Sequence, residues 1–250
     1  MKRFHARFFT PEGNLTAQTQ TAHIVALCFD LTPVALRQRV ADRLVALLNE
    51  HDGHLVTGFL GTPYFCHALS QNGRAKEAWA LLLKDDFPSW LYQVKAGATT
   101  VWEHWDGIKP DGSMWSADMN SFNHYAYGAV GEWLYRTVAG IEADESAPGF
   151  KHVIISPLPG GQLSWVQATY ESIYGEIAVK WQAIKGKVAM TFRIPANTTA
   201  TVKLQAVKEI ENSDGLAFCR SDAGWSATAG SGEYRIDYLP DDSVDLTFTD

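Results

Sequence analysis

The chain has 250 residues, 46% of them hydrophobic, so it can bury the core of one large domain or of two smaller ones. Its formal net charge is -7 and no basic stripe is visible, which argues against a surface that follows nucleic-acid phosphates. No apolar run approaches the ~20 residues of a membrane span, and the start MKRFHARFF lacks the apolar stretch of a signal peptide. We therefore expect neither a nucleic-acid partner nor a membrane partner.

The first part of the chain, from about residue 14 to residue 141, shows helical periodicity. Thr32-Pro33 and Thr62-Pro63 each place a capping residue before a proline at the first helical position. Asn72-Gly73 turns the chain between two apolar helical faces, as in a helical hairpin. A further helix is expected from about Ser121 to Val138.

After about Pro148 the apolar period changes to two, which indicates strands. The alternating apolar sets are Ile177, Val179 and Trp181; Val188, Met190, Phe192 and Ile194; and Val244, Leu246 and Phe248. Short turns separate them, as in a sandwich. The sequence therefore predicts an α+β chain in two parts, with helical hairpins in residues 1–145 and an antiparallel β-sandwich in residues 146–250.

The cysteines of the chain are Cys28, Cys66 and Cys219. They lie far apart, without the pair spacing of a metal site, and their odd number argues against a disulfide framework. We therefore expect free thiols in a reducing, cytoplasmic location. We also expect no bound metal and no cofactor.

One segment between the helices could provide catalytic chemistry. Glu103 follows Trp102 directly and lies close to Trp105. Glycoside hydrolysis needs two carboxyl groups beside the anomeric carbon, and Glu103 suits one of the two roles. The two tryptophans could hold a sugar ring and exclude water. The alternative is a capping box formed by Thr100 and Glu103 at the start of a helix.

A second candidate is His124, within the segment Asn120–Trp133. Asn120 or Ser121 could cap the helix, which would put His124 in its first turn. The imidazole could donate to a sugar hydroxyl or orient a carboxylate, or it could be a structural hydrogen-bonding group. HExxH, GxSxG and glycine-rich phosphate motifs are absent from the sequence.

Five stretches together resemble the bacterial inverting α-L-rhamnosidases with an (α/α)6 barrel, and the likeness covers nearly the whole chain. The stretches are Thr19–Ala22, Thr57–Thr62, Gly97–Glu103, Ser121–Ala126 and Pro195–Ala200. The resemblance implies that Glu103 is the general base and that His124 lines the rhamnose subsite. It also implies a substrate that contains L-rhamnose.

The chain departs from the family pattern in one respect. Met1 begins at what looks like the middle of the barrel, and the family's general acid belongs to the part before it. Asp106, Asp118 and Glu132 do not match the acid motif. We therefore expect a C-terminal portion of such an enzyme, which hydrolyses little or no rhamnoside alone.

An incomplete barrel should also expose apolar helix faces, such as those of Val34, Val40 and Leu44. Self-association or binding to a separate N-terminal half would cover these faces. Two other functions stay open. One is a non-catalytic remnant or sugar-binding module, and the other is a different helical-barrel carbohydrate enzyme of the glucoamylase or epimerase type.

Overall fold

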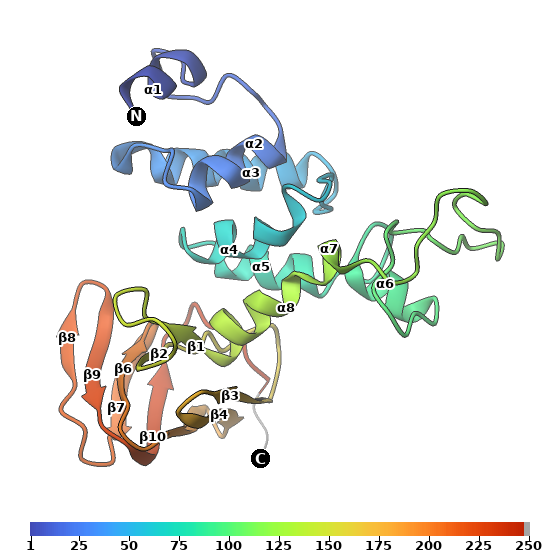
Figure 1. Cartoon of the computed structure of the whole chain (residues 1–250). Coiled ribbons are helices and arrows are strands. Elements are labelled where there is room, and N and C mark those ends of the chain that lie inside the picture. Colours follow the sequence, from blue (N-terminus) through green and yellow to red (C-terminus); the bar gives the residue numbers. More distant parts are fainter. Residues whose placement is uncertain (248–250) are drawn as a thin grey trace. The chain divides into compact units, whose positions relative to one another are not determined.

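The computed structural model describes residues 1–247, and its chain forms two compact units (Figure 1). The first unit runs from Met1 to Gly131 and is helical. The second begins at Glu132 and consists mainly of strands. Within the described residues, no helix is long and apolar enough to cross a membrane.

The helices are short, and most of them lie in the first unit. In chain order they are α1 (Lys2–Phe8), α2 (Gln20–Cys28), η1 (Val34–Leu36), α3 (Arg37–Asn49), η2 (Thr62–Tyr64), α4 (Phe65–Ser70), α5 (Ala75–Leu82), α6 (Trp90–Lys95), α7 (Tyr125–Gly128), α8 (Val130–Trp133) and η3 (Leu134–Ala139). The elements η1 and η2 are 3-10 helices, and η3 is a π-helix.

Two helical hairpins form the core of the first unit, because α2 packs on α3 and α4 packs on α5. Thr19 caps α2 by accepting the N–H of Ala22. The two Thr-Pro signals are confirmed as starts of helical segments, although each opens on a 3-10 turn before the α-helix begins. The buried side chains of this core include Ile24, Leu27, Val40, Leu44, Phe65, Leu69 and Leu81.

The expectation of exposed apolar faces on α3 is wrong in most of its detail. Val34 is 87% exposed, but Val40 is only 2% exposed and Leu44 is completely buried. The reason is that α2 covers the apolar side of α3, since these two helices form a hairpin with each other. The predicted self-association therefore cannot rest on Val40 or Leu44.

The helix expected from Ser121 to Val138 begins later and is interrupted. Tyr125 is the first residue of α7, so His124 is the N-cap and does not lie in the first turn. Helical structure then continues through α8 into the π-helix η3, which ends at Gly140 in the left-handed conformation. A π-bulge of this kind widens the helix locally and disrupts the regular apolar spacing.

The strands belong to the second unit. They are β1 (Ile141–Ala143), β2 (His152–Ile155), β3 (Trp165–Ser172), β4 (Gly175–Ile184), β5 (Lys187–Ile194), β6 (Thr199–Leu204), β7 (Val207–Asn212), β8 (Cys219–Ser221), β9 (Gly224–Ala229) and β10 (Gly232–Pro240). One sheet has the order β1-β2-β6-β9-β8, and the other has the order β3-β4-β5-β10-β7 (Figure 1).

Alternate residues of β4, β5 and β6 are buried, which is the pattern that a sandwich requires. Along β4 the buried positions are Ile177, Val179, Trp181 and Ala183, and their neighbours face outward. The indole N–H of Trp181 donates to the carbonyl oxygen of Val138 at 3.0 Å. The last helical residues of this unit are thereby joined to the middle of the sheet.

Two details of the predicted sandwich are corrected. The β2–β6 pair is parallel, because the chain leaves for the other sheet after β2 and returns in the same direction. The strand expected around Val244 and Leu246 does not form, and Phe248 lies outside the described residues. The two compact units meet between Gly131 and Glu132 in the sequence. The domain boundary expected between residues 145 and 146 stays a prediction.

Candidate active site

Two loop segments that are apart in the sequence lie side by side in the first unit. The N–H of Glu103 donates to the carbonyl oxygen of Ser121 at 2.9 Å, and the N–H of His124 donates to that of Val101 at 2.8 Å. The Thr100 hydroxyl donates to the carbonyl oxygen of Phe122. This antiparallel pairing holds the backbones of Glu103 and His124 in one region.

The Glu103 carboxylate does not form the alternative capping box. Between the end of α6 and the start of α7 the chain is not helical, so there is no helix start for Thr100 and Glu103 to cap. Instead, Oε2 of Glu103 accepts the N–H of Ser121 at 3.1 Å. Within residues 1–247, Oε1 has no hydrogen-bond partner. The side chain is half-buried, oriented through one oxygen and available through the other.

Gln93 in α6 binds the backbone of the residue before Glu103 and of the residue after it. Its Nε2 donates to the carbonyl oxygen of His104 at 3.1 Å, and its Oε1 accepts the N–H of Trp102 at 3.4 Å. The Gln93 side chain is buried. A buried amide that uses both its donor and its acceptor restricts the backbone, so Gln93 helps to position Glu103.

Rings from four segments form an aromatic cluster beside Glu103. Trp105 stacks on Tyr127 with ring centroids 4.0 Å apart and planes 7° apart, and Phe59 stacks on His124 at 4.6 Å and 20°. The ring of Phe59 also contacts that of Tyr127, with centroids 5.2 Å apart. The Trp90 indole N–H donates to the carbonyl oxygen of Tyr127 at 2.8 Å. The aromatic cluster thus comprises Phe59, Trp90, Trp105, His124 and Tyr127.

Electrostatics links Glu103 to the aromatic cluster. Burial raises the pKa of the Tyr127 phenol, and the negative charge of Glu103 raises it further. Tyr127 and His124 both belong to the segment that pairs with the Glu103 loop. Glu103 therefore lies near the aromatic cluster to which His124 and Trp105 belong.

Trp102 contacts a ring that does not belong to the aromatic cluster. It is only 3% exposed and packs edge-on against Phe122, with ring centroids 5.5 Å apart. Its predicted contact with a sugar stays a prediction.

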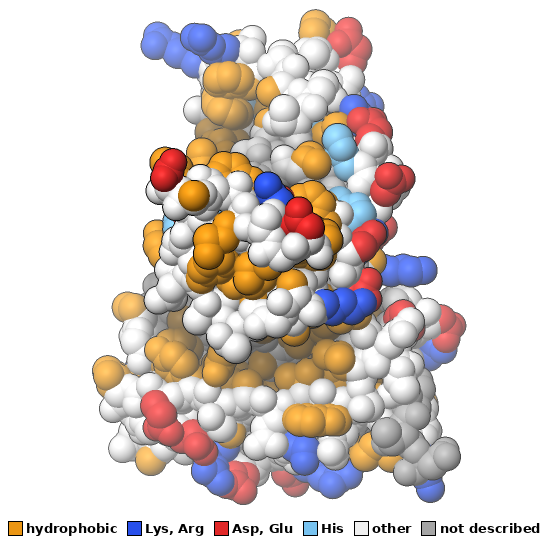
Figure 2. Space-filling model, turned by 90° about the vertical axis from the view of Figure 1, so that its right-hand side faces the viewer, with side chains coloured by type: hydrophobic (Ala, Val, Ile, Leu, Met, Phe, Trp, Pro, Cys, Tyr) orange, Lys and Arg blue, Asp and Glu red, His pale blue; other side chains and the backbone are white. Residues whose placement is uncertain are grey.

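The loop after Glu103 presents further hydrophobic side chains. The ring of Trp115 stacks on that of His104, with centroids 3.6 Å apart. Trp115 is 42% exposed, and Met114 and Met119 are also exposed. Asn120 closes the base of this loop by donating to the carbonyl oxygen of Gly107 at 2.9 Å. Hydrophobic side chains gather in the middle of the face shown in Figure 2, in the region of α6 and this loop.

The comparison with known families decides the identity. The model of the bacterial alpha-L-rhamnosidase 6 hairpin glycosidase domain matches residues 1–138, and that of the bacterial alpha-L-rhamnosidase C-terminal domain matches residues 140–215. The chain belongs to the bacterial α-L-rhamnosidase family. The resemblance seen in the sequence is confirmed, as is the fold class of helical hairpins followed by a β-sandwich.

Individual α-L-rhamnosidases are similar over most of the chain. That of Streptomyces avermitilis is 41% identical over 94% of this chain, and one from Formosa agariphila is 36% identical over 79%. The crystal structure of the S. avermitilis enzyme complexed with L-rhamnose superposes with a TM-score of 0.88. The crystal structure of the Aspergillus terreus enzyme superposes with a TM-score of 0.83; it is 33% identical in sequence and covers 98% of this chain.

The chain spans only part of these α-L-rhamnosidases. It covers 23% of the S. avermitilis enzyme, 21% of the F. agariphila enzyme and 26% of the A. terreus structure. The activity and substrate of the whole enzyme are therefore subjects for proposals, which follow below.

Sequence reasoning did not name four residues of this candidate site, namely Phe59, Trp90, Gln93 and Tyr127. Usable signals existed for Phe59, which lies within the family-like stretch Thr57–Thr62, and for Tyr127, which follows His124 by three positions and so shares its side of a helical turn. Phe59 and Gln93 reach the site through contacts between distant segments, which periodicity does not report. Within the described residues, no three His, Cys, Asp or Glu side chains form a group that could hold a metal ion.

Proposed function

We propose that the protein to which these residues belong hydrolyses terminal α-L-rhamnosides with inversion at the anomeric carbon. The main support is the backbone pairing between Val101–Glu103 and Ser121–His124, which brings a carboxylate and an imidazole to one aromatic cluster. A second support is the similarity to an enzyme crystallised with L-rhamnose.

Glu103 is the proposed general base. The Ser121 N–H orients one carboxylate oxygen, and the other oxygen accepts a proton from water. The water oxygen then bonds to the anomeric carbon as the bond to the leaving oxygen breaks. In inverting enzymes the two carboxyl groups stand ~6.5–9.5 Å apart to leave room for this water. The β-anomer of rhamnose is the first product.

The proposed sugar contacts come from His124, Trp102 and Trp105. His124 donates to a ring hydroxyl, since Phe59 stacks on the imidazole and holds its plane. Trp105, fixed by Tyr127 and Trp90, gives an apolar surface that excludes water. No nucleic acid, membrane, metal or cofactor takes part in this reaction, and a cytoplasmic location fits the expected free thiols.

The general acid is proposed to come from outside residues 1–250, because Asp106, Asp118 and Glu132 do not match the family's acid motif. The similar enzymes are about four times as long as the chain, which leaves ample sequence to provide it. A separately encoded N-terminal half, or a longer polypeptide, would supply both the acid and further sugar contacts.

The test is the substitution Glu103→Gln in the active whole protein, assayed with a chromogenic α-L-rhamnoside. We expect the catalytic rate to fall ~10²–10⁴-fold, because the amide keeps the shape but cannot take the proton. Glu145→Gln, at an exposed position of the second unit, is the matched control and should keep full activity. Near-normal turnover by the Glu103→Gln variant, or α-rhamnose as the first product by NMR, would exclude the proposed role.

A further inference from the structure

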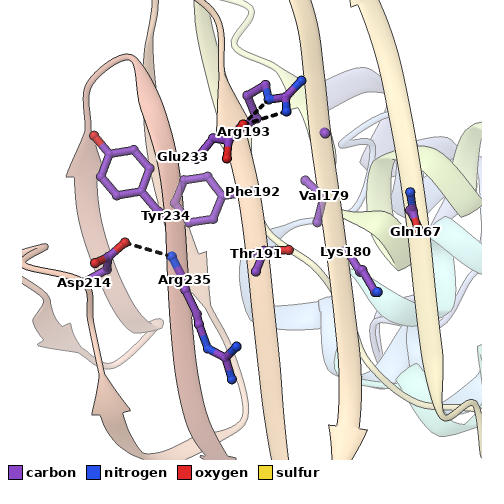
Figure 3. A pocket seen from close by; sticks show the side chains of 11 residues that line it. Gln167, Val179, Lys180, Thr191, Phe192, Arg193, Asp214, Glu233, Tyr234 and Arg235 are labelled. Atoms are coloured by element: carbon purple, nitrogen blue, oxygen red, sulfur yellow. Dashed lines mark hydrogen bonds and ion pairs between the residues drawn. The ribbon is translucent and has the colours of Figure 1, made fainter.

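A groove lies on the outward face of the sheet that contains β3, β4, β5 and β10 (Figure 3). Its volume is about 360 Å³, near the lower end of the ~300–1,000 Å³ range of ligand sites. Asp214, from the loop after β7, lines it and accepts the N–H of Arg235 through Oδ2 at 3.1 Å. The groove lies entirely in the second unit, so it is distinct from the Glu103 site.

A row of polar side chains crosses the groove from strand to strand. The registers place Gln167 opposite Lys180, Lys180 opposite Thr191, and Thr191 opposite Arg235. Side chains directly opposite each other are ~5 Å apart, which suits adjacent hydroxyls of a ligand. The side chains of Gln167, Lys180 and Thr191 make no hydrogen bond or ion pair within residues 1–247. The small Ala178 leaves the space above this row empty.

The remaining charged side chains around the groove, apart from Asp214, form ion pairs. Arg193 forms ion pairs with Glu176 at 2.7 Å and Glu233 at 2.6 Å, and Arg235 pairs with Asp237 at 3.1 Å. Because cations and carboxylates nearly balance, the groove offers little net attraction to a phosphate or another strong anion. Donors and acceptors next to each other match a ligand rich in neutral hydroxyls.

An exposed indole continues the same face beyond the groove. Trp165 is 59% exposed, and it precedes Gln167 by two residues on β3, so both side chains point outward from the same side of the sheet. An indole presents a flat apolar face together with a polar edge. The C–H face of a pyranose ring packs well on such a surface.

We propose that this outer sheet face binds a neutral oligosaccharide, with one sugar over Trp165 and the next hydrogen-bonded to the row of Gln167, Lys180 and Thr191. The site would hold a glycan chain apart from the catalytic centre. It does not depend on the role of Glu103. The open shape of the groove predicts weak binding, with a Kd of ~0.1–1 mM.

Binding is measured by isothermal titration calorimetry on the whole protein carrying Glu103→Gln, with cellotetraose, xylotetraose, mannotetraose and rutinose as neutral probes. We expect saturable binding of at least one probe that survives added salt. Lys180→Ala and Trp165→Ala should each raise the Kd about tenfold. Ala178→Arg should abolish binding, because the long side chain fills the groove.

Lys203→Ala, on the other sheet, is the matched control and should leave the Kd unchanged. Unfolding midpoints of all variants distinguish lost binding from lost folding. The proposal is overturned if none of the four probes binds, or if the groove variants bind as the parent does. It is also overturned if only an anionic probe, tetragalacturonate, binds and salt removes that binding, since the site would then recognise charge. The proposal is likewise overturned if the calorimetric binding signal disappears with His124→Ala, since the probe would then bind at the candidate site of the first unit.

Discussion

At the scale of single residues, His124 makes two kinds of contact that can be separated by experiment. Its Nδ1 accepts the N–H of Ala126 at 3.4 Å and caps α7, while its ring stacks on Phe59 beside Glu103. Asparagine is also a good N-cap residue, but it has no imidazole. Substitution can therefore remove the ring and keep the cap.

We expect His124→Ala and His124→Asn to lose activity to a similar extent in the whole enzyme, with KM raised about tenfold or more. The reason is that both variants lack the proposed donor to the sugar. His124→Asn should keep the parent's thermal unfolding midpoint more closely, because the cap is retained. If His124→Asn restores the KM as well, the residue acts as a cap and not as a sugar ligand.

Cys66 gives the protein a pH-dependent stability. The thiol is fully buried, and burial raises its pKa to about 12, well above the usual value for cysteine. Between about pH 9 and pH 12 the unfolded chain loses this proton while the folded chain keeps it. The free energy of unfolding should therefore fall as pH rises, by up to ~1.4 kcal/mol per pH unit from this group.

Urea unfolding at several pH values from about 8 to about 10 tests this. Cys66→Ala removes the titrating group, so its stability should decline less steeply than that of the parent, although its absolute stability is lower at every pH. Cys219→Ala, at an exposed position, is the control. Parallel declines for the parent and Cys66→Ala would contradict the assignment.

At the scale of elements, Gly140 controls how the π-helix η3 passes into β1. Its φ is +80°, and a Cβ at this position would lie 2.2 Å from the backbone N of Pro157. Gly186, in the turn between β4 and β5, has a φ of +81° with no atom within 4 Å of the Cβ position. The two glycines thus share the conformational requirement and differ in the available space.

Gly140→Ala should destabilise the protein by ~3 kcal/mol or more, because backbone must move to admit the methyl group. Gly186→Ala should cost only ~1–2 kcal/mol, the penalty for a left-handed conformation alone. Chemical denaturation of both variants measures the difference. Equal costs would show that the segment around Pro157 adapts readily.

The sequence predicted those elements whose signals are local. The Thr-Pro starts, the turn at Asn72-Gly73 and the alternation around Trp181 correspond to helices and strands of the structure. The interruption between Tyr125 and Ala139 could not be predicted, because the apolar pattern cannot distinguish an α-helix from one that widens into a π-helix.

The candidate site was predicted only in part for a similar reason. The motifs indicated Glu103 and His124, but the backbone pairing that brings their segments together is non-local. Phe59 stacks on His124 and makes a tilted ring contact with Tyr127, both distant in the sequence, and no spacing rule reports such contacts. The strand expected around Val244 failed because alternation over so few residues also occurs in loops.

At the scale of the whole molecule, the proposed base Glu103 and the proposed sugar-contacting rings are not accompanied by a residue that matches the family's acid motif. Purified residues 1–250 should therefore hydrolyse little or no chromogenic α-L-rhamnoside, because the departing oxygen is left unprotonated. Adding the proposed separate N-terminal half should restore activity. Robust hydrolysis by a pure monomer of residues 1–250 would show that the acid lies within them.

Inactivity even with the added half would favour a non-catalytic, sugar-binding remnant. Gel filtration in the same experiment tests the expected association, either with that half or between copies of the chain. The burial of Val40 and Leu44 restricts any such interface to other residues.

The hydrogen bond between Trp181 and Val138 has a consequence for how such proteins are recombined during evolution. A sandwich copied from residue 146 onward would leave the indole N–H buried without its acceptor, which costs ~1–3 kcal/mol. A copy that begins near Glu132 keeps the acceptor and the helical turns around it. Gene fusions that transfer this β-sandwich to other catalytic domains should therefore retain a short helical leader, inherited together with the strands.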